Sequence, residues 1–295
     1  MPQNVTVIGL GSMGYGMALS CLRAGHTVLG QDVAWDRVAQ FVTEGGLDGP
    51  MDDADAVLVV VLNAAQTESV LFGPNGVVPS LRTGAVVIGC ATVPPDFARE
   101  MERRCAAHRV HYLAAPISGG SVKAAAGKLS VMASGTPEAF AAAEPVLDAT
   151  AETVFRLGDA AGAGSAMKAV NQLLAGVHIA AMAEAMTFGM TQGVTPRRFL
   201  DVISKCAGTS WMLENRAPHI VEGDYTPHSQ VNIWPKDLGI VLDTAGTTGV
   251  DAPITQAALG QYRKAVNMGL GAEDDAAVAK VYARDSGLTL PGENT

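Results

Sequence analysis

The sequence has few charged residues, no cluster of basic residues and no long apolar run. Charged residues make up 17% of its 295 positions and apolar ones 48%, a balance that disfavours disorder and permits a large core. The 20 Lys and Arg residues form no run and are outnumbered by 29 Asp and Glu residues, which argues against nucleic-acid binding. Residues 56–65, a typical apolar run, are too short to span a bilayer, and no basic targeting segment precedes the first strand.

Paired cysteines are also missing. Four cysteines occur, with no CxxC spacing and no accompanying histidine cluster: Cys21, Cys90, Cys105 and Cys206. This pattern excludes a zinc-finger arrangement and is typical of reduced thiols in a cytoplasmic protein rather than of a disulfide framework. We therefore expect no metal and no membrane, and a cytoplasmic location.

Short apolar runs alternate with amphipathic helical segments up to about residue 160. The runs predict strands at residues 5–9, 27–31, 56–62, 85–90, 110–114, 129–133 and 153–157. Several are continuous and β-branched, as in strands covered on both faces. Beyond residue 160 the pattern predicts helices only, beginning with a long one at residues 164–192. The fold class is therefore α/β: a doubly wound, mostly parallel sheet in residues 1–162 and an all-helical domain in residues 163–295.

A glycine pattern follows the first predicted strand. G-x-G-x-x-G spans Gly9, Leu10, Gly11, Ser12, Met13 and Gly14. Gly9 permits a tight strand-to-helix turn, Gly11 lets a pyrophosphate approach the main chain, and Gly14 allows the helix to lie close to the strand. The helix N-terminus offers its N–H groups to the phosphates. With a strand before it and a helix after it, this pattern predicts a Rossmann dinucleotide site rather than an ordinary tight turn.

Asp32 ends the second predicted strand, 23 residues after Gly9, where a ribose-binding acid is expected. Its carboxylate can accept hydrogen bonds from two ribose hydroxyls and would repel a 2′-phosphate. Residues 33–35 supply no arginine, which favours NAD over NADP, although Arg37 is near enough to leave NADP open.

Two further segments carry polar groups that could act in chemistry. Ser118, Gly119 and Gly120 follow a predicted strand, where hydroxyl and backbone N–H groups could hold a carboxylate, although an ordinary β-to-α turn has the same spacing. Lys168, Asn171, Ala175 and His178 are 3, 4 and 3 residues apart and share one stripe of the long helix.

The role of Lys168 depends on its burial. The helix around it is mostly apolar, and a buried lysine has a lowered pKa that suits general acid/base work, whereas a lysine at a helix start can also reach solvent. Spacing alone leaves both open, and His178 by itself is typical of a hydrogen-bonded core residue. Lys236 and Asp237 follow Pro235, where the aspartate could simply stabilise a helix dipole and the lysine be solvated.

Taken together, these motifs resemble the β-hydroxyacid dehydrogenase family, which includes 3-hydroxyisobutyrate and tartronate semialdehyde enzymes. The resemblance covers nearly the whole chain and rests on GLGSMG at 9–14, TVPP at 92–95, APISGG at 115–120, GAGSAMKAVNQ at 162–172 and KDLGIVLD at 236–243. It implies an active site between the two domains and oxidation of a small anionic hydroxy acid with NAD.

The resemblance also implies a role for each matching residue. Lys168 would be the catalytic general acid/base, and Asn171 would position the substrate. Ser118, Gly119 and Gly120 would bind the substrate carboxylate. Leu62, Asn63, Thr92 and Lys236 would contact the cofactor. Departures such as Asn63 in place of the commoner Pro, and Gln172 in place of a second Asn, put the substrate and the finer cofactor contacts in doubt.

Residues 176–180 and 210–227 are similar to a branch of the family that oxidises C2 of four-carbon sugar acids such as L-threonate. In such a pocket His178, Trp211 or Asn215 could meet the extra hydroxyls, although domain packing is the more ordinary role for Trp211 and for Trp234. Turnover of tartronate semialdehyde or 3-hydroxyisobutyrate is the alternative within the family. Outside the family, an imine reductase would be expected to lack Lys168, and a non-catalytic NAD(P)-binding module would show an eroded site.

The long helix has more apolar surface than one small domain needs. Its segment 164–192 is rich in Ala, Leu, Met, Val and Ile on several faces. We therefore expect a homodimer or homotetramer, as the family resemblance also implies.

Overall fold

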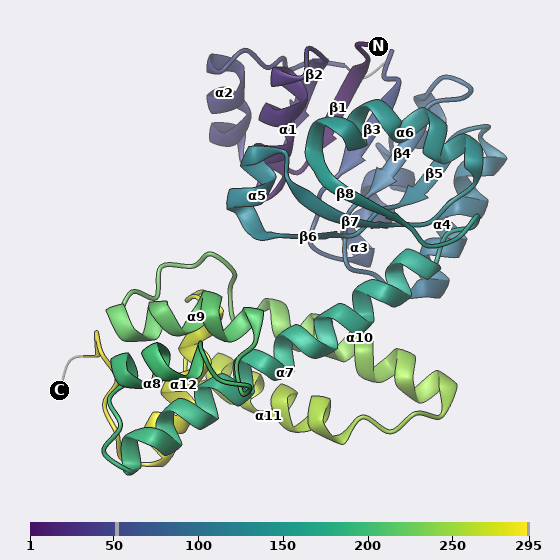
Figure 1. Ribbon diagram of the computed structural model, residues 1–295. Helices are drawn as coiled ribbons and strands as arrows, with labels where there is room; N and C mark the ends of the chain where they lie inside the picture. The colour runs from purple at the N-terminus through teal and green to yellow at the C-terminus, as the bar shows by residue number, and fades with distance from the viewer. Residues whose placement is uncertain (51–52, 294–295) are drawn as a thin grey trace. The chain divides into compact units, whose positions relative to one another are not determined.

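A computed structural model of the chain describes residues 1–50 and 53–293 (Figure 1). The chain divides into a first unit, residues 1–168, and a second unit, residues 169–295, and the division falls inside one long helix. The first unit combines strands and helices and the second is helical in its described residues, so the predicted fold class is confirmed.

The first unit is built on a parallel sheet with the strand order β2-β1-β3-β4-β5. Its strands are β1 (Asn4–Ile8), β2 (Thr27–Gln31), β3 (Ala56–Val59), β4 (Val86–Gly89) and β5 (His111–Ala114). Valine-rich runs place side chains on both faces, and β3 and β4 are buried throughout. Because β1 lies between β2 and β3, the chain reverses its winding there, which is the position where such sheets bind ligands.

A separate three-stranded sheet follows, where one continuous mostly parallel sheet was expected. It contains β6 (Ile117–Ser118), β7 (Leu129–Ala133) and β8 (Ala151–Arg156), with β6 antiparallel to β7. Pro116 lies between β5 and β6 and has no N–H to continue a ladder, while its carbonyl accepts a hydrogen bond from Met132 at 2.9 Å. The chain therefore bends after β5, and the bridge between Ala114 and Ser134 joins the two sheets.

Helices cover both faces of the parallel sheet. They are α1 (Gly14–Arg23), α2 (Trp35–Thr43), α3 (Ala64–Phe72), α4 (Pro95–Ala107), α5 (Gly120–Ala126) and α6 (Pro137–Thr150), with a 3₁₀ turn η1 (Val78–Ser80). Met17 of α1, Phe41 of α2 and Phe140 of α6 share one buried cluster. Leu71 of α3 and Met101 of α4 belong to the cluster on the opposite face. This two-sided burial is what the continuous apolar strands require.

The second unit is organised around α7 (Ala163–Thr191), which closely matches the long helix predicted at 164–192. The helices that follow are α8 (Pro196–Ile203), α9 (Trp211–Glu222), α10 (Ile233–Thr248), α11 (Pro253–Asn267) and α12 (Ala279–Asp285), with η2 (Asp275–Val278) before α12. Thr195 and Ser210 cap α8 and α9 with their hydroxyl oxygens, which explains where these helices begin. Ile179, Met182 and Met186 of α7 lie in the common core.

By length and mean hydropathy, α7 is the one helix of residues 1–50 and 53–293 that could cross a membrane. This differs from the expectation that every apolar run is too short. Core helices of globular proteins pass the same test, and α7 supplies core residues along one side. Its other side exposes further apolar residues, which include Val170, Leu174 and Phe188.

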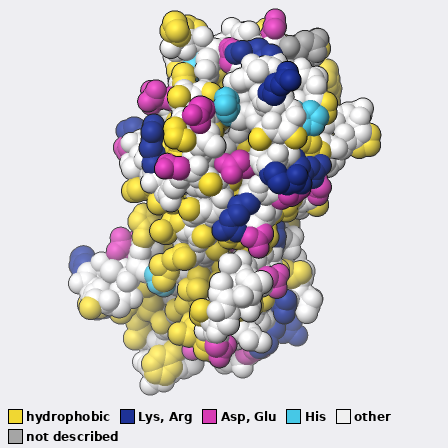
Figure 2. Space-filling view, turned by 90° about the vertical axis from the view of Figure 1, so that its right-hand side faces the viewer, with side chains coloured by type: hydrophobic (Ala, Val, Ile, Leu, Met, Phe, Trp, Pro, Cys, Tyr) yellow, Lys and Arg dark blue, Asp and Glu magenta, His cyan; other side chains and the backbone are white. Residues whose placement is uncertain are grey.

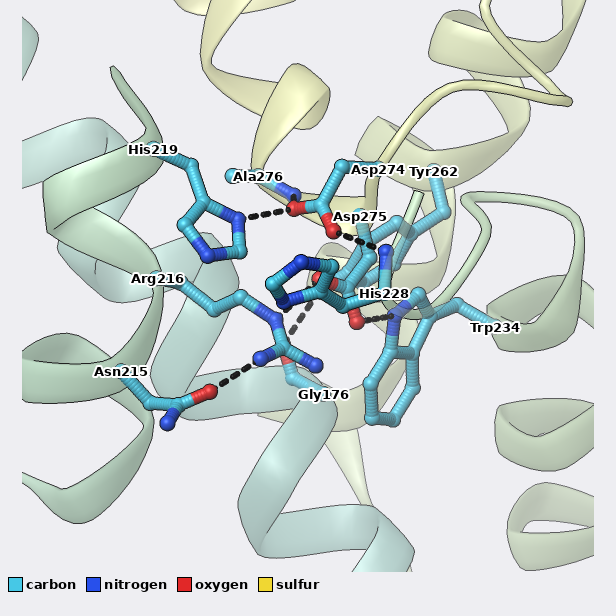
Figure 3. A network of polar contacts seen from close by, with 10 residues as sticks. All are labelled: Gly176, Asn215, Arg216, His219, His228, Trp234, Tyr262, Asp274, Asp275 and Ala276. Carbon is cyan, nitrogen blue, oxygen red and sulfur yellow. Dashed lines mark hydrogen bonds and ion pairs between the residues drawn. The ribbon is translucent and has the colours of Figure 1, made fainter. Parts of the chain in front are cut away.

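Two adjacent aspartates anchor a buried polar network in the second unit (Figure 3). Asp275 accepts hydrogen bonds from Arg216 of α9 and from the indole of Trp234, and Asp274 contacts His219 at 2.9 Å. Burial raises the pKa of Asp275, although Arg216 opposes this. Burial would also raise the pKa of Asp274, but hydrogen bonds from His219 and from backbone N–H groups outweigh it, and the pKa of Asp274 is lowered. The network ties α9, α10 and η2 together.

Candidate functional site

The glycine turn after β1 has the conformation that a phosphate-binding turn needs. Gly9 has φ +97°, and a Cβ there would lie 2.3 Å from the carbonyl oxygen of Val60. A Cβ on Gly14 would lie 1.8 Å from the carbonyl oxygen of Gly9. Both positions therefore exclude every other residue. Gly11 is different, because nothing lies within 4 Å of where its Cβ would be. Its surroundings are open, as the approach of a ligand to the backbone requires.

The N-terminus of α1 adds polarity to this turn. No side chain caps it, and no acidic residue lies in its first turn. Ser12 is exposed and Met13 partly so, and both belong to the turn that leads into the helix. Together with the open side of Gly11, these residues fit a diphosphate held by backbone N–H groups.

Asp32 lies directly beside the glycine turn. Its Oδ2 accepts a hydrogen bond from the backbone N–H of Leu10 at 2.6 Å, and its Oδ1 accepts one from Ala34 at 2.8 Å. The carboxylate thus fastens the turn to the end of β2. A carboxylate oxygen can accept more than one hydrogen bond, so this structural role leaves capacity for a ribose hydroxyl. The sequence did not indicate the bond to Leu10.

The loops after β3 and β4 hold the other predicted cofactor contacts. Asn63 caps α3, because its Oδ1 accepts a hydrogen bond from the N–H of Gln66 at 2.9 Å, and the Gln66 side chain accepts one from the N–H of Leu62 at 2.8 Å. The side chain of Leu62 is exposed, and Thr92 is half-buried after β4. A helix cap is a structural role for Asn63, and its cofactor contact stays a prediction.

The segment after β5 has an unusual backbone. Ser118 ends the short strand β6, and Gly119 and Gly120 have φ values of +138° and +76°, which only glycine adopts readily. The predicted helix follows as α5, so the segment leads from a strand into a helix N-terminus. It therefore presents backbone N–H groups and one hydroxyl directly after β6, the strand that pairs antiparallel with β7 in the three-stranded sheet.

Lys168 is buried, which settles the alternative that the sequence left open. Its residue is 8% exposed, and Nζ donates a hydrogen bond to the carbonyl oxygen of Ile117 at 2.8 Å. Ile117 immediately precedes Ser118, so the lysine of α7 is fixed beside the Ser118–Gly120 segment. Ile117 begins β6, so the bond attaches Lys168 to the three-stranded sheet.

The remaining predicted residues of α7 lie further along the helix. Asn171 is half-buried one turn beyond Lys168, and its amide donates to Gln172 at 3.0 Å. His178 is ten residues from Lys168, about 15 Å along an α-helix at 1.5 Å per residue. That separation is long for one small substrate, and the substrate contact of His178 stays a prediction.

Lys236 and Asp237 have different surroundings from those expected. Helix α10 begins at Ile233, so Asp237 lies beyond its first turn and does not stabilise the helix N-terminus. Asp237 is 2% exposed; its Oδ2 accepts a hydrogen bond from Gln172 at 2.5 Å and its Oδ1 pairs with Lys236 at 2.6 Å. Gln172 thus contacts two of the predicted segments, whereas in the sequence it stood out only as a departure from the family pattern. The sequence feature that could have indicated this contact is the polar side chain of Gln172 one turn after Lys168, in an otherwise mostly apolar helix.

The fold and these residues define a class: a nicotinamide-dependent dehydrogenase with a buried lysine beside a glycine-containing turn. Two family models match the chain. The NAD-binding domain of 6-phosphogluconate dehydrogenase matches residues 4–158, and the NAD-binding domain of NADP-dependent 3-hydroxyisobutyrate dehydrogenase matches residues 162–282.

Individual proteins of known name are also similar to this chain. L-threonate dehydrogenase of Cupriavidus necator is 49% identical over 99% of both chains, and that of Escherichia coli K12 is 46% identical over 98% of this chain and 97% of the relative. A crystal structure of 3-hydroxyisobutyrate dehydrogenase from Salmonella typhimurium matches with a TM-score of 0.90 and 44% identity, over 95% of this chain and 99% of that one. The chain belongs to the 3-hydroxyisobutyrate dehydrogenase-like family of β-hydroxyacid dehydrogenases, and it is a nicotinamide-dependent enzyme that acts on a hydroxy acid.

Among residues 1–50 and 53–293, no group of three or more His, Cys, Asp and Glu residues is arranged to hold a metal ion. All four cysteines are free thiols, three of them buried.

Proposed function

We propose that the protein oxidises the C2 hydroxyl of L-threonate, or of a close tetronate, to the 2-oxo acid and passes the hydride to NAD. The observation that carries the substrate assignment is the near full-length similarity to relatives named L-threonate dehydrogenase, which are 44–49% identical. The observation that carries the chemistry is the buried amine of Lys168 beside the Ser118 segment.

In this proposal Lys168 is the general base for oxidation. A bound nicotinamide supplies the hydride acceptor. Neutral Nζ takes the proton of the substrate hydroxyl as the carbonyl forms, and returns it in the reverse direction. The bond to Ile117 supports this role, because an amine can donate one N–H to a carbonyl whether it is neutral or protonated. The amine is thus held in one place while its lone pair serves the substrate.

The substrate carboxylate belongs at Ser118, Gly119 and Gly120 in this proposal. The positive φ values of the two glycines turn backbone N–H groups in a way that suits an anion, and the Ser118 hydroxyl can add a donor. The Nζ of Lys168 bonds to Ile117, the residue before Ser118. The proposed general acid/base therefore lies close to the proposed carboxylate site. Asn171, one turn along α7, would contact the hydroxyls beyond C2.

The cofactor preference is proposed as NAD over NADP. Asp32 keeps a carboxylate at the ribose end of the glycine turn, held by Leu10 and Ala34, and a 2′-phosphate would face that negative charge. Leu62, Thr92 and Lys236 are proposed as further cofactor contacts, with Asn63 contributing from its position at the start of α3.

3-Hydroxyisobutyrate oxidation is a second candidate, because the Salmonella typhimurium structure with a TM-score of 0.90 carries that name. Tartronate semialdehyde reduction is the other small-acid alternative. NADH formation or consumption, measured with purified protein across hydroxy acids of graded chain length, separates these activities. L-threonate should give the highest kcat/KM. A higher value for either smaller acid would reverse the assignment, and failure with all of them would remove the proposed reaction.

The oligomer is proposed as a homodimer or homotetramer in the cytoplasm. The exposed side of α7 carries Met167, Val170, Leu174 and Phe188, spaced as one helical stripe, and Ile254 of α11 is also exposed. Figure 2 shows hydrophobic side chains gathered over the helical unit. A second copy of the same helix offers a surface of matching length and chemistry, and exposed apolar area of this kind marks interfaces. The free thiols support a reducing compartment.

A further inference from the structure

Helices α7 and α10 meet at Gly176. A Cβ at this position would lie 2.8 Å from the ring of Trp234 and 2.9 Å from Leu238, so the two helices approach as closely as a glycine allows. The hydroxyl of Tyr262 donates to the carbonyl oxygen of Gly176 at 2.9 Å and fixes α11 against the same point. The contact sets which residues of α7 and α10 face each other one turn away.

One turn before Gly176, Gln172 faces Asp237. Gln172 is 8% exposed, and its amide makes two bonds at once: Nε2 donates to Asp237 at 2.5 Å, and Oε1 accepts from Asn171 at 3.0 Å. Asp237 in turn pairs with Lys236 through its other oxygen at 2.6 Å. A continuous chain of four side chains therefore runs from Asn171 through Gln172 and Asp237 to Lys236.

The chemistry of this chain requires a primary amide at position 172. The group must donate to a carboxylate on one side and accept from an amide on the other, which a carboxyl or an alkyl group cannot do at neutral pH. Asparagine has the groups but is one methylene shorter. Asp237 is 2% exposed, and a buried carboxyl group needs hydrogen-bond partners.

We propose that Gln172 is a positioning residue, which holds the substrate-facing Asn171 and the Asp237–Lys236 pair in a single arrangement. This inference rests on the proposed function, in which Asn171 and Lys236 contact substrate and cofactor. In this proposal Gln172 acts through its bonds to Asn171 and Asp237. It determines which way the amide of Asn171 points, because its Oε1 uses one of the two N–H groups of that amide and leaves the other for a substrate hydroxyl.

Two variants test this role, with a third as control. Gln172→Leu keeps the volume and removes both bonds, and Gln172→Asn keeps the amide but shortens it. We expect Gln172→Leu to lower kcat/KM for L-threonate by about tenfold to a hundredfold, the cost of misplacing a substrate contact, and Gln172→Asn to recover part of the loss. Thr187→Val removes a buried hydroxyl from the same helix, one that bonds only to α7 itself, and should leave kcat/KM unchanged.

A binding measurement gives a readout that does not depend on turnover. The dissociation constant of L-threonate from enzyme saturated with NADH should rise about tenfold in Gln172→Leu, while the dissociation constant of NADH itself should change less than about threefold, since Lys236 keeps its bond to Asp237. An unchanged dissociation constant for L-threonate would overturn the proposal.

Gln172→Glu provides a signature that lost packing cannot produce. It places a second carboxylate against Asp237, and because two negative charges in contact repel each other, the pKa of one carboxyl group is raised. The ratio of its kcat/KM to that of the wild type should therefore fall as the pH rises, as the shared proton is lost. A ratio that does not vary with pH in a folded variant would contradict the positioning role. A wild type inactive on every hydroxy acid would instead refute the proposed function, which separates the two failures.

Discussion

The Nζ atom of Lys168 donates a hydrogen bond to the carbonyl oxygen of Ile117 at 2.8 Å. The bond joins α7 to the three-stranded sheet at the residue before Ser118, and it points the amine at the backbone segment with two consecutive positive-φ glycines. A lysine whose only task was to reach solvent would not be 8% exposed with its nitrogen on a main-chain carbonyl. The position of the amine is set by the fold and does not depend on a flexible side chain finding its place.

Lys168→Ala should abolish most turnover without removing cofactor binding. We expect kcat to fall about a thousandfold or more, the scale of lost acid/base catalysis combined with lost positioning. The dissociation constant for NADH, measured by fluorescence, should stay within about twofold of the wild-type value. The exposed Lys123 of α5 offers a matched control, because Lys123→Ala removes the same kind of side chain. Wild-type turnover in Lys168→Ala would refute the assignment.

The two glycines after Gly9 should respond differently to alanine. In Gly14→Ala the new Cβ would meet the carbonyl oxygen of Gly9, so we expect a loss of about 2 kcal/mol or more of stability, measured by denaturant unfolding. In Gly11→Ala the new methyl meets no protein atom, so stability should change by less than about 0.5 kcal/mol while NAD affinity falls about tenfold or more. Unchanged NAD affinity in Gly11→Ala would show that no diphosphate rests there.

Asp32→Ala should weaken NAD binding more than NADP binding. The variant loses hydrogen bonds to the ribose and also the bond that holds Leu10, so NAD affinity should fall by about 1.5–3 kcal/mol. The affinity for NADP should fall less, because removing the carboxylate also removes its repulsion of the 2′-phosphate. Isothermal titration with both cofactors gives the comparison, and an unchanged preference would place selectivity in other residues.

The sequence predicted the elements well wherever a local signal determined them. The strands, the long helix α7 and the helices after it follow from the periodicity of apolar residues. The glycine turn follows from the G-x-G-x-x-G spacing between a strand and a helix. The contacts of Lys168, Gln172 and Asp275 could not be predicted, because each depends on which residues distant in the chain come together. Pro116 is an intermediate case: a proline is visible at this position in the sequence, but the second sheet that begins after it was not predicted.

The start of α10 shows why the local interpretation of Asp237 failed. An aspartate after a proline suggests a helix N-terminus, yet the helix begins at Ile233 and Pro235 lies within its first turn. The side chain is buried against Gln172, 65 positions earlier in the chain. Burial of a charge is decided by tertiary packing, which single-residue propensities do not report.

His219 should make stability depend on pH. Its pKa is raised, chiefly by the hydrogen bond to Asp274, with burial and Arg216 opposing and Asp275 adding to the rise. The ring of His228 packs at 4.8 Å from it. Because the folded value exceeds the unfolded one, the charged imidazole's contribution is complete below the unfolded pKa of about 6.5 and is lost as the pH rises through the folded value.

The measurement is the melting temperature of wild type and His219→Gln across neutral pH. The advantage of the wild type should be largest at about pH 6 and shrink toward about pH 9. Subtracting the melting temperature of His219→Gln from that of the wild type at each pH cancels the contribution of other titrating groups. Arg216→Lys is a useful companion, since it keeps the charge near Asp275 but not the guanidinium geometry. An advantage that grows with pH would show that His219 is not held in its protonated form.

The most direct measurement uses L-threonate carrying deuterium at C2, mixed with the wild-type protein and NAD. The account predicts NADH that contains one deuterium on its nicotinamide ring, and a slower hydride-transfer step than with the unlabelled acid. NADH formed without deuterium would show that the hydride comes from another carbon, and the absence of NADH would contradict the proposed oxidation altogether.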